Sequence, residues 1–226
     1  PPLETNLITM HIGNGVSISA IQGGISVDTS MGLTPLEGAV MGTRCGDIDP
    51  AIILFMIEKE GFYAEEIDSI LNKKSGLLGI TGKYMDRRDI EKAANDGDHR
   101  AQLANQIEAY RLRKYIGSYL AALGKVDAVV FTAGAGELNW KLREKVVTGL
   151  ENLGLVLDKK KNEAAISRDK ETLISADDSP VKIFVIPTDE EIVFIEDVVA
   201  ILEGRYETHT HFTYSFESPK YKKKAE

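Results

Sequence analysis

The 226-residue sequence contains one cysteine, one tryptophan and no long apolar run. Because Cys45 stands alone, no disulfide can form within the chain, and a reducing compartment is its natural setting. The most apolar stretch, residues 51–57, is far shorter than the ~20 residues that a membrane-spanning helix needs. The first residues also lack the basic and apolar regions of a secretory signal. We therefore expect a cytoplasmic protein with no membrane partner.

Positive charge is in short supply as well. The chain has 27 lysines and arginines against 35 aspartates and glutamates, which gives a net charge of −8. An acidic total argues against a general nucleic-acid binder, although it allows a local basic site for a nucleotide. With 43% hydrophobic and 27% charged residues, the composition is that of a globular protein with one sizeable core.

The strongest local signal is a glycine-rich turn, His-Ile-Gly-Asn-Gly, at residues 11–15. Residues 7–10 before it favour a strand, and residues 16–21 after it alternate apolar with polar side chains, the period of a half-buried strand. Asn-Gly between such segments predicts a β-hairpin. One interpretation is an ordinary surface hairpin. The other is a phosphate site, because such a turn exposes backbone N–H groups and glycine allows close approach.

Three further strands are expected along the chain. Residues 25–29 complete a meander with the hairpin, and the apolar runs 126–132 and 182–186 are typical of buried strands. Each of these later strands leads into a turn and then a helix, at about 139–153 and 190–202. A meander followed by strand–turn–helix units predicts an α/β protein with a mixed sheet covered by helices.

The remaining segments favour helices. One helix is expected from Asp49-Pro50 to near Gly61, and a second over residues 64–74. Residues 90–123 are also helical in pattern apart from two glycines. The positions there that we expect to pack on the sheet share helical spacing: Leu103, Ile107, Tyr110, Lys114 and Gly117.

Two segments carry charge without a clear role. The run Lys159–Lys161 is typical of a solvated loop. The tail from residue 204 matches no familiar family segment. Its His209 and His211 have a spacing that permits metal binding, but a loosely ordered terminus is the favoured interpretation.

Several motifs, in this order, resemble the acetate kinase family. They are Met10–Ile18 (MHIGNGVSI), Ser26–Gly38 (SVDTSMGLTPLEG), Met41–Pro50 (MGTRCGDIDP), Asn72–Gly79 (NKKSGLLG), Phe131–Glu137 (FTAGAGE) and Val185–Glu191 (VIPTDEE). Each motif alone is a weak signal, but their shared order is specific, and together they cover nearly the whole chain to about Glu203. The resemblance implies the ribonuclease-H-like, actin-like ATPase fold, in which a mixed sheet is flanked by helices.

The resemblance is to the C-terminal half of acetate kinases, which are about twice as long. It implies that residues 1–203 form a C-terminal nucleotide-binding domain and that residues 204–226 are a tail, the N-terminal domain being absent. It also implies a homodimer built through this domain, with the helix from Ala51 as a candidate contact. The family's other catalytic groups lie in the absent half, so we expect the isolated chain to bind nucleotide without turning it over.

The resemblance assigns the phosphate and transfer residues. The turn His11, Ile12, Gly13, Asn14 and Gly15 corresponds to the phosphate loop, with Asn14 donating to the γ-phosphoryl group. Arg44 corresponds to a catalytic arginine, and a guanidinium suits charge spread over a transferring phosphoryl group. Without the resemblance, Arg44 would be assigned to a surface ion pair with Asp47 or Asp49.

The resemblance also assigns the adenosine contacts. Asp86, Arg87 and Arg88 correspond to a segment beside the adenine and ribose; from the residues alone they are an exposed, charged helix start. The segment Gly134, Ala135, Gly136, Glu137 and Leu138 corresponds to the stretch beside the adenosine and its phosphates. The family usually has Glu-Asn-Ser where this chain has Glu137-Leu138-Asn139, so a polar contact is lost or displaced by one residue.

Two more residues complete the implied site. Glu190 corresponds to the residue associated with Mg²⁺, which Mn²⁺ can replace; the alternative is an acidic residue favoured in the first helical turn. Pro35 corresponds to a proline lining the small acyl pocket. The implied reaction converts ATP and acetate into ADP and acetyl phosphate. A propionate kinase and a non-catalytic, actin-like nucleotide-binding module remain as alternatives.

Overall fold

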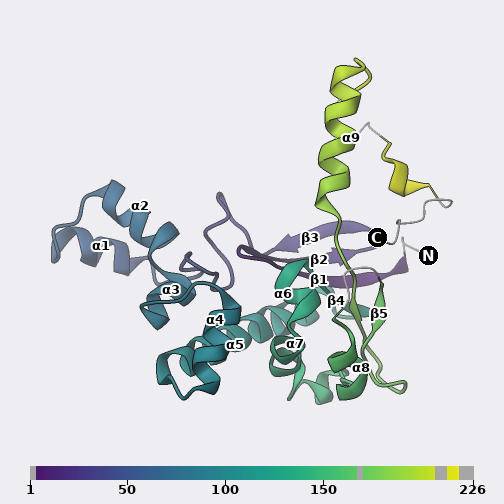
Figure 1. Ribbon diagram of the computed structural model, residues 1–226, viewed down its shortest axis with the longest axis horizontal. Helices are drawn as coiled ribbons and strands as arrows, with labels where there is room; N and C mark the ends of the chain where they lie inside the picture. Colours follow the sequence, from purple (N-terminus) through teal and green to yellow (C-terminus); the bar gives the residue numbers. More distant parts are fainter. Residues whose placement is uncertain (1–3, 167–169, 207–212, 219–226) are drawn as a thin grey trace.

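The computed structural model describes residues 4–166, 170–206 and 213–218. A six-stranded sheet lies at its centre, in the order β3-β2-β1-β4-β6-β5 (Figure 1). The strands are β1 (Asn6–Ile12), β2 (Val16–Gln22), β3 (Ile25–Thr29), β4 (Ala128–Thr132), β5 (Thr172–Leu173) and β6 (Lys182–Val185). The first three are antiparallel neighbours, whereas β4 and β6 run parallel to β1.

The helices of the described chain gather mostly below this sheet in Figure 1, but α1 and α2 extend to one side and α9 rises away from it. They are α1 (Ala51–Glu58), α2 (Ala64–Lys73), α3 (Gly76–Thr81), α4 (Arg87–Asn95), α5 (His99–Leu123), α6 (Ala133–Leu138), α7 (Trp140–Val147), α8 (Lys159–Ala164) and α9 (Glu190–Leu202). Short 3-10 helices occupy Glu151–Leu153 and Ser215–Glu217. No helix in the described ranges is long and apolar enough to cross a membrane.

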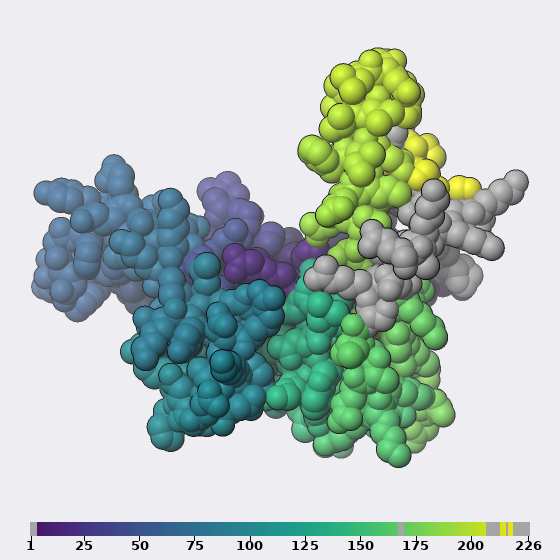
Figure 2. Space-filling model, viewed as in Figure 1, coloured from purple at the N-terminus to yellow at the C-terminus, as the bar shows by residue number. Residues whose placement is uncertain are grey.

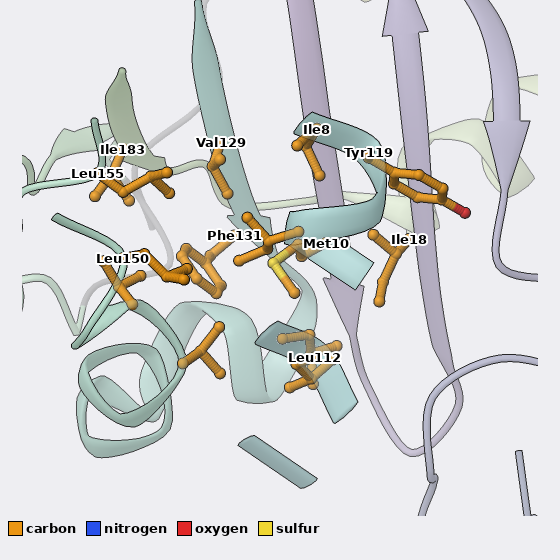
Figure 3. Packing of buried hydrophobic residues seen from close by; sticks show 14 of the residues in the cluster. Ile8, Met10, Ile18, Leu112, Tyr119, Val129, Phe131, Leu150, Leu155 and Ile183 are labelled. Atoms are coloured by element: carbon orange, nitrogen blue, oxygen red, sulfur yellow. The ribbon is translucent and has the colours of Figure 1, made fainter. Parts of the chain in front are cut away.

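The core lies between the sheet and the helices below it. Alternate residues of β1 and β2 are buried, as the sequence period predicts, and they pack in one cluster with α5, while Leu150 and Leu155 after α7 lie beside β4 and β6 (Figure 3). Met10 and Phe131 are register partners on β1 and β4, and both are fully buried. This packing fixes the carboxyl ends of β1 and β4 side by side, where the two glycine-rich segments begin.

The predicted strands are confirmed with small shifts of boundary. Residues 25–29 form β3, residues 128–132 form β4 within the predicted 126–132, and residues 182–185 form β6. The two-residue strand β5 is too short for a period to reveal it. A register shift between Ala20 and Ile21 lies where β2 meets β3.

Several helix predictions need correction. Residues 90–123 divide into α4 and α5 around Gly97, whose φ of +92° no side chain adopts easily, and Asp98 caps the second helix. The predicted buried face of that stretch is wrong: Leu103 and Tyr110 are exposed, and Leu112, Ile116 and Tyr119 pack in the core. The helical spacing of these residues is correct, but apolar residues on more than one face of α5 have the same spacing, so it does not identify the buried face.

The glycine-rich segment after β4 also differs from prediction. It forms the short helix α6, whereas the sequence suggested a turn, and α7 ends at Val147 before Gly149, whereas the predicted helix ran to residue 153. Lys159–Lys161 begin α8 and are not a loop; Lys159 pairs with Glu144 and Lys161 with Asp177. The interpretation of His209 and His211 concerns residues outside the described ranges.

Candidate active site

A cleft of about 750 Å³ opens beyond the carboxyl ends of β1 and β4. Its walls come from the hairpin turn, the start of α4, and the segment joining α6 to α7. The lining residues are Gly13, Asn14, Met85, Asp86, Arg87, Arg88, Glu91, Gly134, Ala135, Leu138, Asn139, Trp140 and Lys141. The cleft therefore brings together three of the segments that the sequence assigned to nucleotide binding, although more than 40 residues separate each from the next along the chain.

The turn of the hairpin is held by its neighbours. The Gly13 N–H donates to the Gly15 carbonyl oxygen at 2.9 Å, and the Gly42 N–H donates to the Asn14 carbonyl oxygen at 3.2 Å. A Cβ at position 42 would lie 2.3 Å from the Asn14 side-chain oxygen, so a larger residue there would displace that side chain. In the described chain, no hydrogen bond engages the N–H groups of Asn14 and Gly15, which leaves them available to an anion.

Ile12 and His11 flank this turn differently. The Ile12 side chain is fully buried in the core, so it can serve a ligand only through its backbone. His11 lies on the opposite face of β1 and is half-buried; its Nε2 is 3.1 Å from Oε1 of Glu190 at the start of α9. The structure therefore places the residue assigned to the metal beside the turn assigned to the phosphates.

Arg44 approaches the same turn from the other side. A Cβ at Gly15 would lie 3.2 Å from Nη1 of Arg44, and that nitrogen donates to the Pro35 carbonyl oxygen at 3.2 Å. Among the described residues Arg44 has no carboxylate partner. Asp47, the partner in the alternative interpretation, accepts instead from Arg111 and from the Tyr115 hydroxyl, at 2.6 and 2.7 Å. Within the part of the chain that the structure describes, no carboxylate compensates the Arg44 charge beside the turn.

The start of α4 presents one exposed and one buried arginine. Asp86 caps the helix by accepting from the Arg88 N–H, and it also pairs with the Arg88 guanidinium at 2.6 Å. The hydrogen bonds from Arg88, together with its charge, lower the pKa of Asp86 to about 2. Arg87, by contrast, turns inward to Glu108 and to the Gly13 carbonyl. The expectation of an exposed charged segment is wrong for this residue.

The opposite wall begins with a strained residue. Ala133 has a φ of +63°, a conformation rare for residues with a Cβ, and it follows β4 directly. Strain of this kind concentrates at functional sites, where the surrounding structure imposes it. Gly134 faces open space, whereas Gly136 packs on the backbone of Phe131. Of the glycines assigned to adenosine binding, Gly134 is therefore the one with room for a ligand.

Glu137 is buried and does not line the cleft. Its Oε1 accepts from both the N–H and the hydroxyl of Thr188, at 2.9 and 3.1 Å. Thr188 belongs to the turn before α9, so Glu137 connects the α6 wall to the segment that carries Glu190. The structure gives this carboxylate a contact with the chain where the sequence expected one with the nucleotide. Leu138 lines the cleft in its place.

A second buried arginine, Arg143, supports this wall from behind. It is fully buried, and among the described residues it donates to neutral oxygens: the carbonyls of Gly136 and Glu137, and acceptors in the Asn162–Ala165 segment. Loss of water around the guanidinium lowers the pKa of Arg143 to about 10. Arg143 donates hydrogen bonds to the last carbonyls of α6 and so holds the end of this helix. The sequence did not predict this role for Arg143.

Several lining residues also escaped the sequence analysis. They are Met85, Glu91, Asn139, Trp140 and Lys141. Trp140 is the single tryptophan of the chain and follows the glycine-rich segment closely, which was an available signal. Lys141 pairs with Glu91 at 2.8 Å across the cleft, and Lys145 also approaches Glu91, so these charges lower the pKa of that carboxyl against the effect of burial.

The sheet and its cleft together define the class of protein. The fold is the ribonuclease-H-like, actin-like ATPase fold, in which a three-stranded meander is extended by two parallel strands. A ligand-sized cleft lies at the carboxyl ends of the central strands. The chain belongs to the acetokinase family, whose model matches residues 1–196.

Individual relatives agree with that assignment. The chain is 66% identical to the acetate kinase of Geobacter metallireducens over 215 residues, which cover 95% of this chain and 51% of that protein. This match extends into the 204–226 tail, where the motifs of the sequence give no family counterpart. The chain spans about half the length of the curated relatives it matches.

Solved structures give the same result. The acetate kinase of Porphyromonas gingivalis superposes with a TM-score of 0.83 at 48% identity, over 88% of this chain and 50% of that one. A propionate kinase from Francisella tularensis superposes with a TM-score of 0.77 at 45% identity, over 83% of this chain and 47% of that one.

Proposed function

We propose that this chain supplies the nucleotide-binding half of an ATP:acetate phosphotransferase, which interconverts ATP and acetate with ADP and acetyl phosphate. The observation that carries the proposal is the meeting of the Asn14 turn, the unpaired Arg44 and the nucleotide-sized cleft in a chain of the acetokinase family. Phosphoryl transfer needs positioning and fixed positive charge more than covalent chemistry from the protein, and these parts supply both.

Each wall of the site has a role in this scheme. The adenosine lies in the cleft between the start of α4 and the Gly134–Leu138 segment, with Asp86 and Arg88 on one side. The free N–H groups of Asn14 and Gly15 hold the β- and γ-phosphates. An acetate oxygen attacks the γ-phosphorus, the bond from that phosphorus to the β–γ bridging oxygen breaks, and ADP leaves without a proton transfer.

Arg44 faces the charge that develops during this transfer. Its planar fork of donors suits both the equatorial phosphoryl oxygens and a neighbouring carboxylate. The Pro35 carbonyl holds one guanidinium nitrogen in place, so Pro35 is next to the group that would face the carboxylate. We therefore assign Arg44 and Asn14 to catalysis and Pro35 to the substrate pocket.

The residues fit a magnesium ion of the kind that nucleotides carry. Glu190 offers one exposed carboxylate beside His11, and the described chain holds no cluster of three or more possible metal ligands. Mg²⁺ prefers such a setting because it keeps several waters and takes one or two carboxylates plus phosphate oxygens. When bound, the ion, or Mn²⁺ in its place, neutralises charge on the phosphates.

We assign residues 1–203 to the C-terminal, nucleotide-binding domain and residues 204–226 to a tail. Support comes from the family model, which matches residues 1–196, and from the relatives, of which this chain spans about half. Holding two reactants in line can lower a barrier by ~7–11 kcal/mol, so a chain with one wall of the reaction site should bind nucleotide without measurable turnover. The single cysteine favours a cytoplasmic setting.

Calorimetric titration with MgADP, beside a hydroxamate assay for acetyl phosphate, tests the proposal. The 226-residue chain should bind MgADP but form no acetyl phosphate. The whole protein should bind MgADP and also form acetyl phosphate. No binding at millimolar MgADP would refute the nucleotide site. Acetyl phosphate formed by the chain alone would refute the claim that the other half carries essential groups.

Two rival functions predict different results. The likeness to a Francisella tularensis propionate kinase supports the first rival, which would show a higher kcat/KM for propionate than for acetate in the whole protein. A non-catalytic, actin-like module would bind ATP in the same way with or without acetate or propionate, and it would form no acyl phosphate.

We also propose that the chain forms a homodimer through α1. This helix has no buried residue, and Ile52, Leu54, Phe55 and Ile57 are exposed on it. Contiguous apolar surface of this kind marks interaction sites. The net charge of −8 disfavours nucleic acid and anionic membranes as the partner, and a second copy presents the same apolar surface.

A further inference from the structure

The buried ion pair between Arg87 and Glu108 contacts the glycine-rich turn at residues 11–15, here called the phosphate turn. Nε of Arg87 is 2.6 Å from Oε1 of Glu108, in the middle of α5, and Nη1 is 2.6 Å from the Gly13 carbonyl oxygen. Both side chains are about nine-tenths buried or more. A planar guanidinium holds its donors in fixed directions, so the Gly13 carbonyl is fixed relative to α5.

Fixing this carbonyl also fixes a donor. The Gly13 carbonyl and the Asn14 N–H belong to one planar trans peptide unit, in which the two groups point in opposite directions. With the carbonyl drawn to Arg87, the Asn14 N–H must point away from it. The Gly42 N–H does the same for the next unit: it holds the Asn14 carbonyl, and so directs the Gly15 N–H. These are the two N–H groups of the turn without a partner in the described chain.

The turn needs such anchors because it contains two glycines. Glycine adopts left- and right-handed backbone conformations with similar ease, so an unanchored peptide unit here can rotate. After rotation a carbonyl oxygen would replace the N–H and would repel a phosphate. Within the described residues, Nη2 of Arg87 is buried without a hydrogen-bond partner, so the guanidinium also keeps one donor unused beside the cleft.

We propose that Arg87 is a positioning residue for the phosphate turn, and that Glu108 holds its guanidinium in register. This inference rests on the proposed function, which supplies the phosphate ligand. Arg87 acts on the phosphate chain of the nucleotide through the Gly13–Asn14 peptide and does not select the base. The role differs from the adenosine contact that the sequence resemblance implied for the Asp86–Arg88 segment.

The test compares ligands with and without phosphates, because simple loosening of the cleft would weaken both. Binding of MgADP and of adenosine is measured by calorimetry for the wild-type chain, Arg87→Lys, and the double variant Arg87→Met/Glu108→Leu. Lysine keeps the charge but lacks the fork. The double variant removes both buried charges together, which avoids leaving one of them unpaired. Arg113→Met is the matched control, because Arg113 also donates to carbonyl oxygens, at Lys145 and Val146, away from the turn.

We expect both Arg87 variants to bind MgADP about tenfold or more weakly, the loss of one charged hydrogen bond, and to bind adenosine as the wild type does. The control should bind both ligands normally. Equal losses for MgADP and adenosine, or unchanged MgADP binding, would overturn the positioning role while leaving the proposed function standing. A wild-type chain that binds neither ligand would overturn the nucleotide site itself, and this inference with it.

Discussion

Two regions of this chain treat apolar residues in opposite ways. Helix α5 is nearly neutral in average hydropathy, yet it buries eight of its 25 residues against the sheet and neighbouring helices. Helices α1 and α9 are far more apolar, yet α1 buries none of its residues and α9 buries only Ala200. Figures 1 and 2 show both helices extending from the body that holds the sheet and cleft. Apolar content alone therefore does not decide which segments form the core.

The difference assigns separate tasks to the two regions. The body pairs most of its buried polar groups internally, through contacts such as Arg87–Glu108 and the carbonyl contacts of Arg143. The extended helices leave large apolar surface in contact with water, which isolated monomers rarely do. On α9, the segment 213–218 meets the acidic side, where Tyr214 donates to Asp197, and the apolar residues stay exposed. The body holds the candidate cleft, and the extended helices expose apolar surface of the kind that suits association.

The largest expected effect tests whether the chemistry belongs to the body. Arg44→Ala in the whole protein should lower kcat by ~10³-fold or more, as for other arginines that stabilise a transferring phosphoryl group. Its KM for acetate and MgATP should change less, because the charge acts mainly in the transition state. Steady-state hydroxamate assays measure both quantities. Near-normal turnover would show that Arg44 has no catalytic role. Arg113→Ala is the control for the loss of a cation elsewhere in the body.

The sequence predicted most of the body and less of its internal connections. Strands and the last helix follow from period and turn residues, because Val126–Thr132 and Lys182–Ile186 are apolar runs that end at Gly- or Pro-containing turns. The buried face of α5 did not follow, since Leu103 and Tyr110 fit the helical period as well as Leu112 and Ile116 do. Which stripe meets the sheet is decided by tertiary packing, and a single period cannot encode it.

The site was predicted in its segments but not in its side-chain directions. The motifs located the turn, the start of α4 and the stretch after β4, and the structure brings these to one cleft. They did not reveal that Arg87 and Glu137 turn inward, to Gly13 and to Thr188. A charged residue in a motif reads the same whether it meets a ligand or the chain's own backbone. The catalytic and binding roles of the residues in this site stay predictions.

The second prediction compares two phenylalanines of the two regions. Phe131→Ala on β4 removes a fully buried ring and should lower the free energy of unfolding by about 3–5 kcal/mol. Phe194→Ala on α9 truncates a ring that is 70% exposed and should change it by less than ~0.5 kcal/mol in the isolated chain. Urea unfolding of both variants measures the difference. A large loss for Phe194→Ala would show that α9 is packed in solution, and the contrast between the regions would fail.

The third prediction concerns association through α1. Leu54→Glu places a charge on its exposed apolar surface and should convert a dimer into a monomer, because an unpaired carboxylate is costly to bury in an interface. Light scattering at micromolar concentration would show the mass fall by half. Leu153→Glu, an exposed leucine outside both extended helices, is the control. A wild-type chain that is monomeric at all concentrations would refute association through this helix.

The smallest expected effect concerns Asp86, which both caps α4 and pairs its charge with Arg88. Two variants separate these contributions. Asp86→Ala removes the acceptor for the Arg88 N–H and should cost about 1 kcal/mol of stability at pH 7. Asp86→Asn keeps an acceptor of similar capping strength but lacks the charge that pairs with Arg88, so at neutral pH it should lose much less than the alanine variant. The contrast between the two variants isolates the helix cap.

Acid titration then isolates the charge of Asp86. Its pKa is lowered to about 2 in the folded chain by the hydrogen bonds and charge of Arg88, whereas an unfolded aspartate titrates near ~3.9. A carboxyl with a lowered folded pKa stabilises the fold above its unfolded pKa, and this contribution is lost as the pH falls from there through the folded value. The stability of the wild type should therefore fall toward that of Asp86→Asn between about pH 5 and 2. Chemical unfolding at a series of pH values measures the gap, and a gap that stays constant throughout would show that the Asp86–Arg88 pair adds nothing in solution.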